Sequence, residues 1–253
     1  MTRIILHGCM GQMGRVVSEL AASLDDLEIV AGVDQRREAD LPAYPVYERI
    51  RDCREEADAV VDFSVAAAVD ALLEDCVQKK LPLVLCTTGL SRAQLDALDA
   101  AAGEIPVLKS ANMSLGINLL LRLVRDAAGA LKDAGFDIEI VEKHHRRKLD
   151  APSGTAIALA DSVSKGLTGD HPYVFDRSTR KEQRPKEEIG ISAVRGGTIV
   201  GEHDVIFAGT DEVITLSHSA YSRAIFAKGA IAAAHFLKGK RAGYYDMSDV
   251  IGS

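Results

Sequence analysis

Tryptophan is absent from this sequence of 253 residues, and aromatic residues together make up only 5% of it. Proteins that bind single-stranded nucleic acids stack successive bases on aromatic side chains, and this chain has few to offer. Its formal net charge of −7 also has the wrong sign for a general nucleic-acid-binding surface. We therefore expect no nucleic-acid partner, and basic residues can matter only where they cluster locally.

Cysteine is scarce and irregularly spaced. The four cysteines are Cys9, Cys53, Cys76 and Cys86, and no two of them form a CxxC pair. This spacing disfavours a zinc site or a disulfide framework. Free thiols in a reducing compartment are the simpler interpretation, and they predict a cytoplasmic protein.

Long apolar runs are also missing. No segment has the roughly 18 consecutive apolar residues that a membrane span needs. The run Ile4–Leu6 near the start is too short for a signal peptide. We expect no membrane partner. Hydrophobic residues still make up 47% of the chain, enough for a core in one large domain or two moderate ones.

Short apolar runs alternate with segments of helical period over the first 112 residues. The predicted strands are Arg3–His7, Glu28–Val33, Ala59–Phe63, Leu83–Cys86 and Pro106–Leu108. The predicted helices between them are Gln12–Ser23, Val65–Lys79 and Arg92–Ala102. This order predicts an α/β fold with a Rossmann-type, doubly wound parallel sheet.

The pattern changes after about residue 112. The predicted elements are helix Leu115–Leu131, strand Phe136–Val141, helix Ala156–Leu167, strands Ile189–Val194, Thr198–Phe207 and Glu212–His218, and a closing helix Arg223–Leu237. The closely spaced strands predict a mixed or antiparallel sheet with one exposed face. The polar segment Asp176–Glu188 is predicted to be a mobile loop. We expect an α+β domain at 115–223, inserted into a nucleotide-binding domain at 1–114 and 224–253.

A glycine-rich loop follows the first predicted strand and opens the first predicted helix. It reads Gly8-Cys9-Met10-Gly11-Gln12-Met13-Gly14, with GxxGxxG spacing in place of the commoner GxGxxG. Glycines let the backbone approach a pyrophosphate, and the helix N-terminus favours the anion. Asp34 lies 20 residues beyond Gly14, where an acid binds a ribose hydroxyl. The loop predicts dinucleotide binding; the alternative is a tight turn beside a surface acid.

The choice of cofactor rests on the residues around Asp34. A carboxylate there favours NAD, because it repels the 2′-phosphate of NADP. Arg36 and Arg37 follow closely and are able to pair with that phosphate; in the alternative they belong to a solvated loop. We expect NADH as the primary cofactor, with NADPH possible.

Three further loops follow predicted strands at the edge where such sheets bind ligands. They are Asp62-Phe63-Ser64, Cys86-Thr87-Thr88-Gly89 and Ala111-Asn112-Met113-Ser114. Each loop alone also fits a helix cap. As a set they predict a wall for the nicotinamide and its ribose, formed by Phe63, Cys86, Thr87, Thr88, Ala111, Asn112, Met113 and Ser114.

The segment Glu142–Ala156 has the greatest concentration of chemically useful residues. Six cation-capable residues run from Lys143 to Lys148, and the turn Ser153-Gly154-Thr155 then starts a predicted helix. Basic side chains beside free backbone N–H groups suit a small anionic substrate, with His and Lys available for proton transfer. An isolated charge run is otherwise a solvated face. A metal pair of His144 and His145 is disfavoured, because adjacent strand residues point to opposite faces.

These motifs together resemble the 4-hydroxy-tetrahydrodipicolinate reductase (dihydrodipicolinate reductase) family over essentially the whole length. The segment EKHHRRKLDAPSGTA at Glu142–Ala156 has the most specific similarity. The other matching segments are Gly8–Arg15, Thr87–Gly89, Val194–Arg195, Val200–His203 and Ser222–Arg223. Two positions depart from the family pattern: Cys86 stands where a glycine is common, and Gln35 where enzymes that use NADPH well often have arginine.

The resemblance implies NAD(P)H-dependent reduction of 4-hydroxy-tetrahydrodipicolinate to tetrahydrodipicolinate, in the diaminopimelate route of lysine biosynthesis. It implies a homotetramer whose inserted domain binds the dicarboxylate and forms the tetramer contacts. His144 and Lys148 are then expected to transfer protons, and no metal is expected. The expected substrate-binding residues are His145, Ser153, Gly154, Thr155 and Arg223.

The sequence leaves several assignments open. Arg223 equally fits an ion pair between domains, and Arg146 and Arg147 are expected only to contribute positive potential. His7, His171, His203, His218 and His235 have no comparable context and fit ordinary core or surface positions. The alternative functions are another NAD-dependent dehydrogenase, with Cys86 as the candidate nucleophile, and a non-catalytic NAD-sensing module.

Overall fold

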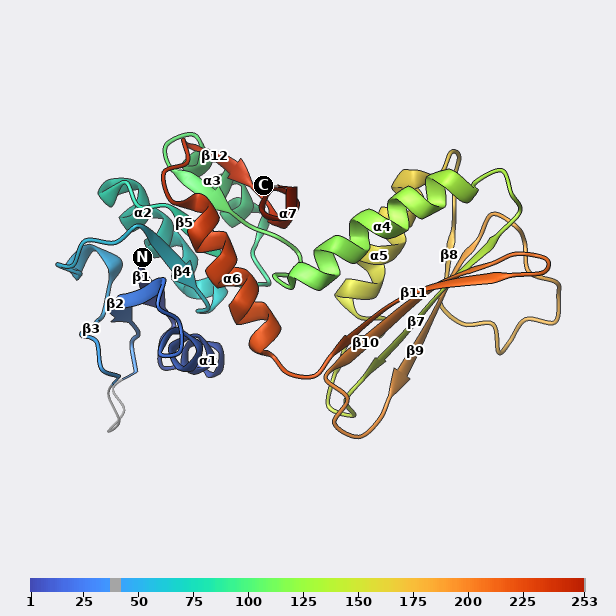
Figure 1. Cartoon of the computed structure of the whole chain (residues 1–253), viewed down its shortest axis with the longest axis horizontal. Helices are drawn as coiled ribbons and strands as arrows, with labels where there is room; N and C mark the ends of the chain where they lie inside the picture. The colour runs from blue at the N-terminus through green and yellow to red at the C-terminus, as the bar shows by residue number, and fades with distance from the viewer. Residues whose placement is uncertain (37–41, 253) are drawn as a thin grey trace. The chain divides into compact units, whose positions relative to one another are not determined.

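The computed structural model describes residues 1–36 and 42–252, which divide into two compact units (Figure 1). The first unit comprises Met1–Ser114 and the C-terminal segment from Arg223 onward, and the second comprises Leu115–Ser222. Arg223, which the sequence assigned to the inserted domain, therefore starts the returning segment of the first unit. Within the described residues, no helix has both the length and the apolar composition needed to cross a bilayer.

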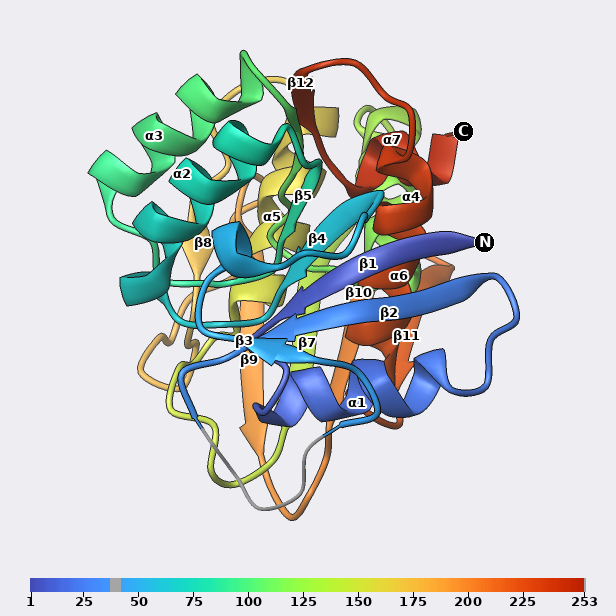
Figure 2. The ribbon, with the colours of Figure 1, turned by 90° about the vertical axis from the view of Figure 1, so that its left-hand side faces the viewer.

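The first unit is built on a parallel sheet of seven strands, in the order β12-β6-β5-β4-β1-β2-β3 (Figure 2). The strands are β1 (Thr2–His7), β2 (Leu27–Val33), β3 (Val46–Tyr47), β4 (Ala59–Asp62), β5 (Leu83–Leu85), β6 (Pro106–Leu108) and β12 (Gly243–Tyr245). The predicted doubly wound parallel sheet is confirmed. Its central strands are buried on both faces, which explains why they read as continuous apolar runs.

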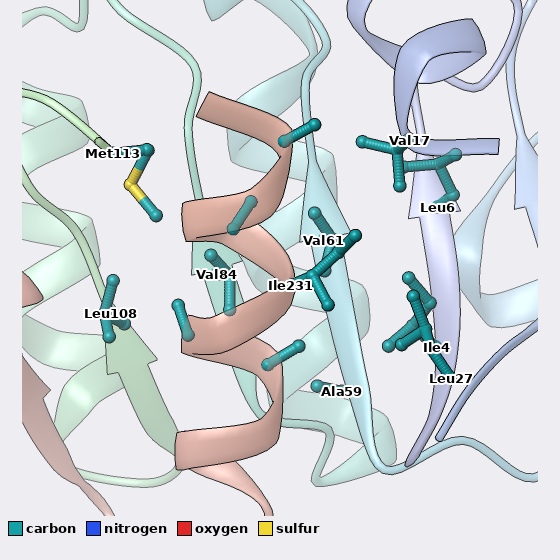
Figure 3. Packing of buried hydrophobic residues seen from close by; sticks show 14 of the residues in the cluster. Ile4, Leu6, Val17, Leu27, Ala59, Val61, Val84, Leu108, Met113 and Ile231 are labelled. Atoms are coloured by element: carbon teal, nitrogen blue, oxygen red, sulfur yellow. The ribbon is translucent and has the colours of Figure 1, made fainter. Parts of the chain in front are cut away.

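Helices cover both faces of this sheet. α1 (Gln12–Ala21) and α6 (Ala224–Leu237) pack on one face, and α2 (Val69–Lys79) and α3 (Arg92–Ala102) on the other. Successive residues of a strand point to opposite faces, so Ile4 contributes to the first core and Ile5 to the second. Figure 3 shows the first of these cores, with Ile231 of α6 beside Val61 of β4.

The prediction that a helix ending at Leu237 closes the chain is wrong. After α6 the chain adds β12 to the sheet, parallel to β6, and ends in the short helix α7 (Met247–Gly252). The three residues of β12 and the two of β3 are too few to produce a periodic pattern. Two 3₁₀ turns, η1 (Ile50–Asp52) and η2 (Ala66–Ala68), were likewise not predicted as such.

The second unit is a mixed sheet of five strands, in the order β11-β10-β7-β9-β8. Its elements are α4 (Leu115–Leu131), β7 (Asp137–His144), α5 (Gly154–Gly166), β8 (Tyr173–Val174), β9 (Ile189–Arg195), β10 (Gly201–Ala208) and β11 (Val213–Ala220). α4 and α5 cover one face with a common core, so the predicted mixed sheet with one open face is confirmed (Figure 1).

Strand β7 runs three residues beyond its predicted end at Val141. Its even-numbered residues, from Ile138 to His144, all face the covered side of the sheet. Because the alternation continues to the end of the strand, two polar side chains, Glu142 and His144, are carried into the buried layer. This extension of β7 therefore positions the polar residues of the candidate site in the second unit.

The polar segment Asp176–Glu188 has neither helix nor strand, but it is tied to the sheet. Arg184 donates from Nη2 to the carbonyl oxygens of Ile138, at 2.8 Å, and Glu188, at 2.6 Å. Its Nε contacts the Glu139 carboxylate at 2.8 Å. Arg184 therefore fixes this loop against β7.

Candidate functional site

The glycine loop of the first unit has no room for side chains at two of its glycines. Gly8 has a φ of +78°, and a Cβ there would lie 2.6 Å from the Phe63 carbonyl oxygen. A Cβ on Gly14 would lie 2.3 Å from the carbonyl oxygen of Gly8. The N-cap of α1 is Gly11, whose lack of a side chain leaves the first-turn amides without a side-chain acceptor. Such a helix start is suited to a phosphate anion.

Asp34 is held in place at the end of β2. Its Oδ2 accepts from the Met10 amide at 3.0 Å, and its Oδ1 accepts from the Arg36 amide at 2.9 Å. These two bonds fix the carboxylate beside the glycine loop and leave lone pairs for a ligand hydroxyl. Arg36 is exposed close by. Arg37 lies outside the described residues.

A cavity of about 670 Å³ opens along this edge of the sheet. Six of the residues predicted to bind the cofactor line it: Gly8, Gly11, Gln12, Met13, Asp34 and Phe63. Cys9, Met10, Gly14, Cys86, Thr87, Thr88, Ala111, Asn112, Met113 and Ser114 do not. Several of these serve the framework instead. Cys9, Met10 and Met113, for example, pack into the core under α6.

The strand-end loops are linked to each other by polar contacts. The Oδ1 of Asp62 accepts from the Ser64 amide at 3.1 Å and lies 2.8 Å from His7 Nδ1. The Cys86 amide donates to the Asp62 carbonyl at 3.0 Å. Burial, reinforced by Asp62, raises the pKa of the Cys86 thiol well above its ordinary value. A thiol kept protonated in this way is a poor nucleophile, so nothing here supports the alternative of a thiol-dependent dehydrogenase.

Arg223 lies beside the glycine loop. Its Nη1 donates to Gln12 Oε1 at 2.6 Å. The sequence assigned Arg223 to substrate binding and Gln12 to cofactor binding, and the structure joins the two side chains. Arg223 also serves as the N-cap residue of α6.

The second unit is organised around the carboxylate of Glu142, which is fully buried. Oε2 lies 2.6 Å from His144 Nδ1 and accepts from Arg195 Nη1 at 2.7 Å. Oε1 accepts from Arg195 Nη2 at 2.7 Å and from the Ser153 amide at 3.0 Å. Burial alone would raise the pKa of Glu142, but these hydrogen bonds outweigh it and lower the pKa. Glu142 is therefore a charged anchor for three chain segments.

His144 is held as a neutral imidazole. Burial lowers its pKa, and the hydrogen bond to Glu142 opposes this only in part. Since Glu142 is ionised, the proton of the ring sits on Nδ1 and is donated to that carboxylate. Nε2 then carries a lone pair. It lies over Gly201, where a Cβ would come within 3.0 Å.

The predicted basic cluster is split by the structure. Lys143 lies on the other face of β7 and pairs with Glu202 at 3.0 Å. Arg146 and Arg147 are exposed. Lys148 follows on a tight turn, closed by its amide on the His145 carbonyl at 3.1 Å, and its Nζ contacts Asp150 at 3.0 Å. Lys148, only 23% exposed, is thus the partly sheltered ammonium group of this loop.

Helix α5 starts directly after this loop, at Gly154. The N-cap is Ser153, whose Oγ accepts from the Ala156 amide at 3.2 Å. The side chain of Ser153 also meets His203 of β10, with Oγ 3.1 Å from Nε2. Gly154 and Thr155 form the first turn, as the predicted anion site requires.

Sequence reasoning missed three residues of this network: Glu142 as its centre, Arg195 and His203. His203 packs edge-on against His144, with ring centroids 5.1 Å apart. It is also the residue of β10 that stands directly opposite Glu142. In the sequence, the only sign of these residues was their place in the matched motifs. Their convergence follows from the pairing of β7 with β9 and β10, which joins positions more than 50 residues apart. Among the residues described, no three His, Cys, Asp or Glu side chains converge as metal ligands.

The neutral state of His203 makes stability depend on pH. Burial, and next the neighbouring His144, lowers its pKa from 6.5 to about 4. As the pH falls below 6.5 the unfolded chain takes up a proton here and the folded chain does not, so stability falls until about pH 4. The gap between the two pKa values corresponds to about 3 kcal/mol. We expect urea unfolding, followed by circular dichroism, to show a shallower loss of stability from pH 6.5 to 5 in His203→Gln than in the wild type. Equal slopes would contradict this assignment.

Comparisons with known proteins found relatives that match the whole length of this chain. The family description "Dihydrodipicolinate reductase, N-terminus" matches residues 2–113, and "Dihydrodipicolinate reductase, C-terminus" matches residues 116–251. The 4-hydroxy-tetrahydrodipicolinate reductase of Caldanaerobacter subterraneus subsp. tengcongensis is 53% identical over 252 residues, covering 99% of this chain and 98% of the relative. That of Clostridium tetani is 48% identical over 254 residues, covering 100% and 98%. Dipicolinate-bound dihydrodipicolinate reductase from Paenisporosarcina sp. TG-14 has the same fold, with a TM-score of 0.81, 23% identity and 97% of both chains covered.

Proposed function

Because the chain belongs to the dihydrodipicolinate reductase family, we propose that it is an NAD(P)H-dependent reductase of 4-hydroxy-tetrahydrodipicolinate. The product is tetrahydrodipicolinate, in the diaminopimelate route of lysine biosynthesis. The structural support for the proposal comes from Glu142. The buried Glu142 carboxylate binds both His144 and the Ser153 amide, so the basic loop and the anion-binding helix start are built as a single site.

The first unit is proposed to hold the cofactor. The room left by Gly8 and Gly14, the uncapped start of α1 and the fixed Asp34 carboxylate all fit a dinucleotide. Bound NAD(P)H supplies the hydride that reduces the ring. The amides of Gln12 and Met13 are assigned to the pyrophosphate, and Asp34 to a ribose hydroxyl.

The second unit is proposed to hold the dicarboxylate. The Ser153 hydroxyl and the first-turn backbone of Gly154 and Thr155 are assigned to one carboxylate, because the helix dipole at the start of α5 favours a negative charge. The Ser153 amide is already engaged by Glu142, and the Gly154 amide by Asp150. His145 is assigned to the same carboxylate. Positive charge on this loop stabilises the anion that develops as hydride adds to the ring.

Lys148 is the better candidate for the proton donor. The one ring proton of neutral His144 is engaged in the hydrogen bond to Glu142, and its Nε2 carries a lone pair that cannot donate. Lys148 has three N–H donors, one of which is engaged by Asp150. We therefore assign proton delivery to Lys148, and we assign to His144 a neutral imidazole that shapes the site.

The assembly proposed for this protein is a homotetramer in the cytoplasm. The open face of the second unit's sheet presents apolar side chains, including Val213 of β11, which is 62% exposed, and Val194 of β9, which is 46% exposed. Exposed apolar patches of this kind mark protein contacts. Sedimentation analysis of the purified chain tests the oligomeric state.

Turnover is tested by NADH oxidation with freshly generated product of dihydrodipicolinate synthase. The proposal expects oxidation that depends on both the synthase product and this protein. NADH binding without turnover would instead support the alternative of a non-catalytic NAD-sensing module.

Asp34 is proposed to set the preference for NADH. We expect Asp34→Ala to raise the KM for NADH by about 10- to 100-fold, because a hydrogen bond to a charged group is lost. The KM for NADPH should change less or fall, since the repulsion of its phosphate also disappears. The measurement is kcat/KM for both cofactors. As a control, Arg36→Ala should lower NADPH use and leave NADH use unchanged. A wild type that strongly prefers NADPH would overturn this interpretation of Asp34.

A further inference from the structure

The hydroxyl oxygen of Ser153 takes part in two hydrogen bonds. The side chain is buried, with 2% of its surface exposed. Its oxygen accepts from the Ala156 amide at 3.2 Å and lies 3.1 Å from His203 Nε2. A serine hydroxyl has one proton to donate and two lone pairs. The direction of the bond to His203 therefore decides whether the hydroxyl proton is used within the protein or stays free for a ligand.

The surroundings of His203 indicate that direction. Among the described residues, its Nδ1 is buried without a hydrogen-bond partner. A proton on Nδ1 would thus be a buried N–H without an acceptor, which is rarer in folded proteins than an unpaired acceptor. With the ring neutral, the less costly tautomer carries its proton on Nε2. That proton is donated to Ser153 Oγ.

Both lone pairs of Ser153 are then occupied. One accepts from Ala156 at the start of α5, and the other accepts from His203. The amide of Ser153 is also engaged, because it donates to Glu142 Oε1 at 3.0 Å. The hydroxyl proton is the one donor of this residue that no described group uses.

We propose that His203 is a positioning residue, which donates from Nε2 to Ser153 Oγ and so reserves the Ser153 hydroxyl as a donor to an oxygen of the dicarboxylate substrate. The inference rests on the proposed function for the identity of the ligand. His203 does not itself touch the substrate. With the opposite tautomer, Ser153 would donate to His203 and have no proton left for the substrate.

The tautomer of His203 is measurable without any turnover. ¹⁵N-labelled protein at pH 7.5 should give a two-bond proton–nitrogen spectrum in which Nε2 of His203 is protonated and Nδ1 is not, with His203→Gln identifying the signal. The reverse pattern would overturn the proposal, whether or not the protein reduces 4-hydroxy-tetrahydrodipicolinate.

Binding of pyridine-2,6-dicarboxylate, measured by calorimetry, tests the consequence for the ligand. We expect His203→Met, which removes the donor, to weaken binding by about tenfold and to raise the substrate KM similarly, with kcat within about twofold. His203→Gln, which keeps an N–H donor of similar reach, should stay within about twofold of wild type. His218→Met is the matched control, because His218 pairs opposite His203 on β11, where it acts on His203 only as a neighbouring imidazole, and the donor to Ser153 Oγ is His203.

A double-mutant cycle separates positioning from general damage. In a Ser153→Ala background, His203→Met should cause no further loss of dicarboxylate affinity, because its effect passes through the missing hydroxyl. Additive losses, or wild-type affinity in His203→Met, would overturn the proposal. Unchanged NADH affinity confirms that the first unit of each variant is folded. Dicarboxylate binding without turnover would count against the proposed reaction and leave this inference standing.

Discussion

Lys148→Ala is expected to lower kcat by about 100- to 10,000-fold, the contribution typical of a positioned general acid. The reason lies in the contrast between the two candidates. The ring N–H of His144 is engaged in a hydrogen bond to Glu142, whereas Lys148 is partly sheltered and keeps N–H donors beyond its contact with Asp150. The measurement is steady-state oxidation of NADH with the synthase product, together with the dissociation constant for NADH, which should not change.

Two controls accompany this substitution. Arg147→Ala removes an exposed positive charge from the same loop and should change kcat by less than about threefold. Asp150→Asn removes the carboxylate that contacts Lys148 and should leave most of the activity. If Lys148→Ala kept the wild-type kcat and His144→Gln were inactive, the proton donor would be His144 and the assignment to Lys148 would be wrong.

Glu142→Ala is expected to destabilise the second unit by about 3–5 kcal/mol, the usual cost of breaking a buried ion pair from one side. The substitution leaves the Arg195 guanidinium and the Ser153 amide without their buried acceptor. It also frees His144 Nδ1, so the loss of activity should accompany the loss of stability. Hydrogen exchange of the amides in the first turn of α5 reports the local effect directly.

A matched control exists on the same strand. Glu139 is also on β7 but on the open face, where it contacts Arg184. Arg184 keeps its bonds to the carbonyls of Ile138 and Glu188 when Glu139 is removed. Glu139→Ala should therefore cost less than about 1 kcal/mol. Equal destabilisation by the two substitutions would show that Glu142 has no special structural role.

The fold of the first unit was largely predictable from the sequence. Parallel strands that are buried on both faces are largely apolar, so the predicted strands Ala59–Phe63 and Leu83–Cys86 agree with β4 and β5 to within one residue. The edge strands β3 and β12 were not found, because two or three residues contain no period. The position of β12 depends on pairing with Val107 of β6, far away in the sequence, and that of β3 on pairing with Gly32 of the neighbouring strand β2.

The candidate site was predictable only in part. The helix start at Ser153 and the basic loop have local signatures, and both were recognised. The burial of Glu142 and His144 was not, because polar residues at the end of β7 interrupt its apolar alternation. They are tolerated there because Arg195 and His203 meet them from neighbouring strands. Such partners follow from strand register, which a single sequence does not specify.

The chain leaves the first unit after Ser114 and returns to it at Arg223. Helix α6, which covers one face of the seven-stranded sheet, and the edge strand β12 are therefore synthesised only after the whole second unit. On the ribosome, the glycine loop and Asp34 emerge before the second unit, but the apolar sheet face beneath α6 stays uncovered until the second unit has been synthesised. A prematurely terminated chain would thus expose this face to chaperones and proteases, even where its second unit is whole.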